Sequence, residues 1–268
     1  MTFPTGSRFS PLLALAHDLA DRSGAVIRPQ FRKTIAVANK ASADAFDPVT
    51  KADQGAERAI SRLIRQRAPG HGIVGEEFGS ERPDSPLQWI IDPIDGTRSF
   101  ITGTPMWGTL IGLLHEGTPV LGMMDQPFTR ERYWSAEKAS YLREASGKPR
   151  KLRTRACPQL SDALMMTTSP DLFERGAEED GFGRVKRAVR MTRYGGDCYA
   201  YCLLAAGFVD LVVEAGLKSY DVVALIPIVE RAGGRITTWD GRPATAGGRI
   251  VASGDPALHA RALKLLNR

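Results

Sequence analysis

The chain has 268 residues, 43% of them hydrophobic, enough to bury a substantial core in one large unit or two moderate ones. Its net charge is +6, and the densest basic run, Lys148 to Arg155, contains no aromatic residue, which favours a solvated loop over a nucleic-acid-binding surface. No apolar run approaches the ~20 residues that span a bilayer, and residues 1–10 lack the pattern of a secretion signal. We therefore expect a cytoplasmic protein without membrane contact.

The sequence of the first half predicts two amphipathic helices followed by a sheet. Apolar residues over 12–20 form one face of a helix that Ser10 could cap. Thr50 and Asp53 have the spacing of a capping box at the start of a second helix. We expect this helix to end at Pro69-Gly70. Strand-like segments follow, with turns that favour an antiparallel meander, at 72–74, 88–91, 107–114, 119–125 and 132–135.

The polar, basic stretch from Leu142 to Gln159 is the predicted boundary between two halves, residues 1–150 and 151–268. Beyond it, strand and helix patterns alternate. The predicted strands are 163–168, 185–189, 208–214, 235–238 and 249–252, and the predicted helices are 197–206, 222–232 and 256–266. The sequence thus predicts an α+β half followed by an α/β half.

Three cysteines offer no disulfide framework. Cys198 and Cys202 would share one face of the helix over 197–206, so we predict that both thiols are small core residues. A redox role is the alternative.

The segment from Trp89 to Thr97 carries the clearest chemical signal, because an apolar strand runs into two carboxylates three positions apart. Pro93 cannot continue a sheet ladder, so we expect the chain to turn there. Asp92 and Asp95 would then lie at the rim of a core, where cations such as Mg²⁺ must neutralise them. Gly96 permits close backbone approach, and N–H groups after it could hold an anion. A metal-bound phosphate is indicated; a polar turn is the alternative.

Further motifs occur in order along the chain, at 47–53, at Gly75-Glu76-Glu77 and at 220–224. Together with W-I-I-D-P-I-D-G-T they resemble the inositol monophosphatase-like family of Mg²⁺-dependent phosphatases, over about residues 10 to 255. The resemblance implies the layered αβαβα sandwich of the sugar-phosphatase type, with the active site between the two halves. It also implies a homodimer.

By this resemblance, two or three Mg²⁺ ions lie among carboxylates and one backbone carbonyl, an arrangement that can clamp both oxygens of a phosphoryl transfer. The implied ligands are Glu76, Asp92, Ile94, Asp95 and Asp221. By itself, Asp221 could be a simple helix N-cap, and Glu77 an exposed acid or a support for the ligands.

Asp95, Gly96 and Thr97 are the predicted phosphate-binding residues. Water is the expected nucleophile, because no serine or cysteine lies in a nucleophile motif. Asp47 and Thr97 match the family pair that orients and activates this water, although Asp47-Pro48 alone could simply open a turn. The four histidines are expected at the surface or in the core.

Segments 95–103, 124–127, 194–201 and 214–221 resemble the histidinol-phosphate phosphatase branch of the family, although Ser219 replaces an expected proline. Asp197 and Glu214 could bind the ammonium and imidazole groups of histidinol, whereas Asp197 could also be a helix N-cap. The predicted function is Mg²⁺-dependent hydrolysis of L-histidinol phosphate in histidine synthesis. The alternatives are an inositol-1-monophosphatase or broad sugar-phosphate phosphatase, and a basic regulatory or RNA-associated protein that kept only the fold.

Overall fold

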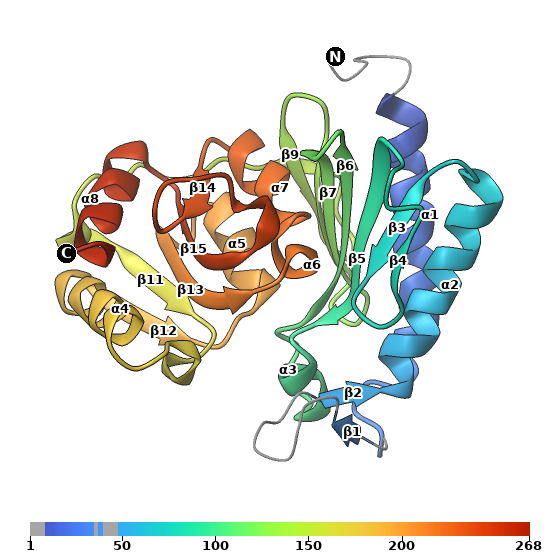
Figure 1. The fold of residues 1–268 in the computed structure, drawn as a ribbon, viewed down its shortest axis with the longest axis horizontal. Coiled ribbons are helices and arrows are strands. Elements are labelled where there is room, and N and C mark those ends of the chain that lie inside the picture. The colour runs from blue at the N-terminus through green and yellow to red at the C-terminus, as the bar shows by residue number, and fades with distance from the viewer. Residues whose placement is uncertain (1–8, 35–36, 40–47) are drawn as a thin grey trace.

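The structure, a computed structural model, describes residues 9–34, 37–39 and 48–268 (Figure 1). Helices and sheets alternate in five layers, as the family resemblance implies. Two helices cover the outer face of an eight-stranded sheet, a second helical layer fills the space between this sheet and a five-stranded sheet, and two more helices cover the far side. None of the helices in these residues is long and apolar enough to cross a bilayer.

The outer helical layer consists of α1 (Phe9–Ile27) and α2 (Lys51–Arg67), which pack against each other and against the first sheet. The capping box of α2 is confirmed. The Thr50 hydroxyl accepts a 3.0 Å hydrogen bond from the Ala52 N–H, and the Asp53 carboxylate accepts the Thr50 N–H at 2.8 Å. By contrast, α1 begins at Phe9, so Ser10 lies within the first turn and not at the cap position.

The first sheet has the strand order β10-β9-β8-β7-β6-β5-β3-β4. From β5 onward it is the predicted antiparallel meander, whereas β3 pairs parallel with β5. Its strands are β3 (Gly72–Gly75), β4 (Gly79–Glu81), β5 (Leu87–Asp95), β6 (Gly108–His115), β7 (Thr118–Gln126), β8 (Glu131–Ser135), β9 (Ser140–Arg143) and β10 (Arg150–Lys151). Two short strands, β1 (Val37–Asn39) and β2 (Pro48–Thr50), pair separately.

Strand β5 does not end before Pro93, and the predicted turn there was wrong. Asp92 lies opposite Leu110 of β6 and Asp95 lies opposite Gly108, so β5 contains one residue more than its partner over this stretch. Such a bulge tolerates proline, because the extra residue does not have to donate to the ladder. The strand therefore carries both carboxylates to its end, where α3 (Thr97–Ile101) begins.

The second sheet has the order β12-β11-β13-β15-β14. Its strands are β11 (Leu164–Thr167), β12 (Met191–Tyr194), β13 (Leu211–Leu217), β14 (Arg235–Thr238) and β15 (Gly248–Ser253). Val212 of β13 faces the middle layer, formed by α5 (Cys198–Ala205), α6 (Ser219–Val222) and α7 (Leu225–Arg231). Its neighbours Leu211 and Val213 face α4 (Ala177–Ala188) and α8 (Pro256–Leu266). This alternation buries the sheet on both faces.

Two predicted elements of the second half differ from the structure. Residues 185–188 are the last turn of α4 and not a strand, because Val185 packs with Phe182 on one helical face. The predicted helix 222–232 is two helices, α6 and α7. Pro227 lies in the first turn of α7, where its missing N–H has no intrahelical partner to lose. The first sheet ends at Lys151 and the second begins at Leu164, but the division into domains at residue 150 stays a prediction.

Candidate active site

Three carboxylates meet where β5 approaches α6. One oxygen each of Asp92, Asp95 and Asp221 lies within 4.8 Å of the others. Residues three apart on a regular strand point to opposite faces of the sheet. The bulge between Asp92 and Asp95 adds the residue that brings both side chains to the same side. The cluster therefore depends on an irregularity in the strand.

Asp221 is the third residue of α6, so it is not the N-cap that one interpretation of the sequence suggested. Its Oδ2 accepts the Lys218 N–H at 2.6 Å, which fixes the side chain at the start of the helix. The same carboxylate also contributes an oxygen to the acid cluster.

The acids of this cluster are held in unfavourable surroundings. Burial raises the pKa of Asp92, and the nearby charges of Glu76, Asp95 and Asp221 raise it further. Burial, with the charges of Asp197 and Asp221, raises the pKa of Asp95, and burial raises that of Asp221 to about 7. A cation among these oxygens would remove the repulsion, and an all-oxygen donor set suits Mg²⁺. The residues present therefore fit a divalent metal ion.

Glu76 follows β3 and is not one of the three acids that share the 4.8 Å group. Its charge nevertheless acts on Asp92 and on Asp221, so it lies beside the cluster. The Ile94 carbonyl accepts a 3.0 Å hydrogen bond from the Thr97 hydroxyl and retains a second lone pair. Both positions are compatible with the ligand roles that the resemblance implies.

Glu57 was missed by the sequence interpretation. It is a buried residue of α2, and its carboxylate accepts the N–H groups of Glu77 at 2.8 Å and Phe78 at 3.0 Å. It thereby fixes the turn that carries Glu76, and the backbone of Glu77 is part of this support. The sequence contained a signal for this role, because Asp53 and Glu57 are acids one helical turn apart on the mostly apolar buried face of α2.

The start of α3 is shaped by Gly96, whose φ of 88° is in the left-handed region. A Cβ at this position would lie 2.9 Å from the Met106 carbonyl oxygen and 3.1 Å from the Asp197 carboxylate. Thr97 then opens the helix, whose first N–H groups have no intrahelical partner. Asp47, the predicted partner of Thr97 in water activation, lies outside the described residues.

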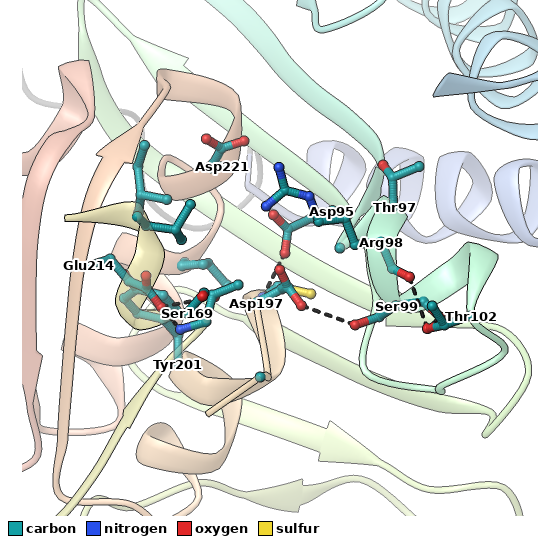
Figure 2. A pocket seen from close by; sticks show the side chains of 17 residues that line it. Asp95, Thr97, Arg98, Ser99, Thr102, Ser169, Asp197, Tyr201, Glu214 and Asp221 are labelled. Carbon is teal, nitrogen blue, oxygen red and sulfur yellow. Dashed lines mark hydrogen bonds between the residues drawn. The ribbon is translucent and has the colours of Figure 1, made fainter. Parts of the chain in front are cut away.

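A cavity of about 510 Å³ extends from the acid cluster between α3, α5 and β13 (Figure 2). Asp95, Gly96, Thr97, Asp197, Glu214 and Asp221 all line it. The structure thus brings together residues that are 126 positions apart in the sequence, from Asp95 to Asp221.

Asp197 occupies the N-cap position of α5, as one interpretation of the sequence suggested, but its side chain makes no capping hydrogen bond. Its carboxylate instead accepts the Ser99 hydroxyl at 3.3 Å. The backbone of Asp197 has φ 43° and ψ −130°, a conformation that strains any residue except glycine. Burial raises the pKa of Asp197 to about 6.

Glu214 lies in β13 and is 1% exposed. Its Oε1 accepts the Thr168 N–H at 2.8 Å and the Thr168 hydroxyl at 3.0 Å, and its Oε2 accepts the Thr167 hydroxyl at 3.4 Å. Within the described part of the chain, no lysine or arginine forms an ion pair with it. Burial raises the pKa of Glu214 to about 8 despite these hydrogen bonds.

Cys198 and Cys202 are buried core residues, as predicted, and burial raises the pKa of both thiols. Thiols in such surroundings are poor nucleophiles, which argues against a redox role. His17, His71 and His259 are engaged elsewhere, with Arg132, Trp89 and Thr237 respectively.

The inositol monophosphatase family model matches residues 9–268. Bifunctional phosphatase IMPL2, chloroplastic, of Arabidopsis thaliana is 46% identical over 264 residues, which cover 94% of this chain and 74% of that protein. Histidinol-phosphatase of Mycobacterium tuberculosis is 34% identical over 257 residues, covering 95% of this chain and 97% of that protein. An inositol monophosphatase from Zymomonas mobilis superposes with a TM-score of 0.87 at 43% identity, covering 98% of this chain and all of that one. The chain therefore belongs to the inositol monophosphatase family of phosphatases.

Proposed function

We propose that this chain hydrolyses L-histidinol phosphate to L-histidinol in a Mg²⁺-dependent reaction. The observation that carries the substrate assignment is a pair of carboxylates that line the cavity next to the acid cluster, the half-buried Asp197 and the buried Glu214. A buried carboxylate without a cationic partner, such as Glu214, is unfavourable, and the charge of Arg98 offsets the desolvation of Asp197 only in part, since its pKa stays raised. The ammonium group of histidinol would supply that partner, whereas inositol is neutral. The name of the Mycobacterium tuberculosis relative supports the same substrate.

The metal would be held by the carboxylates of Glu76, Asp92, Asp95 and Asp221 and the Ile94 carbonyl. When bound, Mg²⁺ neutralises charge on the transferring phosphate and lowers the pKa of water. The N–H groups of Gly96 and Thr97 at the start of α3 would hold phosphate oxygens. The attacking water would form the new phosphorus–oxygen bond and give its proton to Asp47 as the ester bond breaks, and the leaving alcohol oxygen would take a proton from solvent.

Specificity would come from two acids that line the cavity beside the metal-binding carboxylates. Asp197 and Glu214 would receive charge-assisted hydrogen bonds from the ammonium group, each contributing about 1.5–3 kcal/mol. Their positions are fixed by Ser99 and Thr168, so little reorganisation is needed when the substrate binds.

A phosphate-release panel tests this proposal. It compares histidinol phosphate, inositol 1-phosphate, fructose 1,6-bisphosphate and 3′-phosphoadenosine 5′-phosphate, each with Mg²⁺ and with EDTA. We expect histidinol phosphate to have the highest kcat/KM and EDTA to abolish turnover. A preference for inositol 1-phosphate would replace the histidinol assignment with the broader phosphatase function. No hydrolysis of any ester would support the regulatory alternative.

Paired variants test the two specificity acids. Asp197→Ala and Glu214→Ala should each lower kcat/KM on histidinol phosphate by about ten- to a hundred-fold. p-Nitrophenyl phosphate is the control substrate, because it has no ammonium group and should lose much less activity. Equal losses on both substrates would make these acids structural.

The resemblance to the family also supports a homodimer. Size-exclusion chromatography with light scattering tests it, and a monomer at micromolar concentration would contradict it.

A further inference from the structure

Tyr201 lies in α5 and forms part of the cavity wall, where it is 2% exposed (Figure 2). Within the described residues its hydroxyl has no hydrogen-bond partner, and its oxygen is covered so closely that solvent cannot replace one. A buried polar group left without a partner costs about 1–3 kcal/mol. Folded proteins rarely keep such a group unless it serves a purpose.

The neighbouring Tyr199 shows that a position in α5 does not by itself leave a tyrosine hydroxyl without a hydrogen-bond partner. It is two residues earlier in α5 and also buried, yet its hydroxyl donates to Glu131 at 2.6 Å and contacts the Thr129 hydroxyl at 3.0 Å. One tyrosine of the helix is therefore fully satisfied by the fold. The other, which lines the cavity, is not.

The surroundings of Tyr201 make its hydroxyl a donor. Burial raises its pKa, and the charges of Glu214, Asp95 and Asp221 raise it further, so the proton stays on the oxygen. The same three side chains line the cavity together with Tyr201, so its ring borders the space next to the acid cluster and Glu214. The organic part of a bound phosphate ester would occupy that space.

We propose that Tyr201 is a specificity-determining residue whose hydroxyl donates a hydrogen bond to an acceptor on the organic part of the substrate. This inference rests on the proposed function, and it assigns the unprotonated imidazole nitrogen of histidinol phosphate as the acceptor. The ammonium group offers only donors and would be bound by carboxylates, so the ring nitrogen needs a donor. Substrate entry must shift the side chains that cover the hydroxyl.

The test uses Tyr201→Phe, with Tyr199→Phe as the matched control, and three esters. Histidinol phosphate has the ammonium and the ring, O-phosphoethanolamine has the ammonium alone, and p-nitrophenyl phosphate has neither. Tyr201→Phe should lower kcat/KM on histidinol phosphate about three- to ten-fold, mainly through KM, and should change the other two esters less than twofold. Tyr199→Phe should leave the ratios among the three esters unchanged.

Thermal unfolding adds a measurement that does not depend on turnover. Tyr201→Phe should keep or raise Tm, because it removes an unsatisfied hydroxyl, whereas Tyr199→Phe should lower Tm. Equal activity losses on all three esters, no loss on histidinol phosphate, or a lowered Tm for Tyr201→Phe would each overturn the inference. Failure of the proposed function is seen separately, because unmutated protein would then not prefer histidinol phosphate.

Discussion

The backbone N–H of Cys198 donates a 2.6 Å hydrogen bond to Oδ2 of Asp95, and this bond joins the two halves of the molecule. Asp95 ends a strand of the first sheet, and Cys198 begins a helix of the middle layer. The bond favours the charged carboxylate and so opposes the burial that raises the pKa of Asp95. The acid cluster is thus complete only when the two halves are packed together.

Asp95→Asn tests the importance of this carboxylate. The amide oxygen can still accept the Cys198 N–H, but the charge is lost, so kcat should fall at least about 10²-fold. Circular dichroism should show an unchanged fold, because one buried repulsion is relieved. Near-normal turnover by a folded variant would rule out the assignment of Asp95 to the reaction.

Glu57 should control metal affinity without touching the metal. Glu57→Ala removes the acceptor for the Glu77 and Phe78 N–H groups, which frees the turn that carries Glu76. The Mg²⁺ concentration for half-maximal activity should rise about tenfold or more, as is usual when a support for a ligand is lost. Glu81→Ala is the control, since Glu81 ends the second strand of the same hairpin and its side chain forms an exposed pair with Arg65 of α2. An unchanged Mg²⁺ dependence would limit Glu57 to a structural role.

Asp197 should show a trade-off between stability and specificity. Its backbone conformation suits glycine, and its carboxylate is buried, so Asp197→Gly should stabilise the protein by about 1 kcal/mol. Asp197→Ala keeps the backbone strain and should be less stable than the glycine variant. Both should lose activity on histidinol phosphate equally. Urea denaturation compares the variants, and a glycine variant no more stable than the alanine variant would mean that the strain is absent.

Stability of the metal-free protein should depend on pH through the buried acids. The pKa values of Asp221, about 7, and Glu214, about 8, lie above their ordinary values of 3.8 and 4.5, so the folded state binds more protons than the unfolded state. Their contribution is full below the ordinary values and is lost as pH rises through 7 and 8. The free energy of unfolding in EDTA should therefore fall as pH rises from about 4 to about 8, and it should level off above the folded-state pKa values.

Two histidines change stability with pH in the opposite direction, over a range that overlaps the lower part of this one, so the effect of the acids is clearest between about pH 6.5 and pH 8. Burial lowers the pKa of His17 and His259 to about 4, so they reduce stability only as pH falls below 6.5. Saturating Mg²⁺ should remove the fall at high pH, since it binds the charged carboxylates of the folded state. Asp221→Asn should reduce that fall in EDTA. A flat profile in EDTA would show that the acids are not stressed in the metal-free protein.

The sequence by itself determined the family, most of the helices and strands, and the acids at Asp92, Asp95 and Asp221. The family and the role of Asp221 came from the resemblance of ordered motifs, whereas Asp92, Asp95 and most of the helices and strands followed from local patterns. An apolar run specifies a buried strand, and a carboxylate directly after it must be neutralised. The capping box at Thr50 was equally predictable, because its hydrogen bonds join residues three apart.

Only the tertiary structure decided how these residues meet. The sequence suggested a turn at Pro93, but pairing with β6 makes a bulge that brings Asp92 and Asp95 to one side. Val185 was predicted as strand, although packing against Phe182 keeps it helical. The support of Glu57 for the Glu76 turn and the unpartnered hydroxyl of Tyr201 depend on contacts between segments far apart in the chain. Such contacts leave no periodic signal in the sequence, because burial and partners are set by the packed layers.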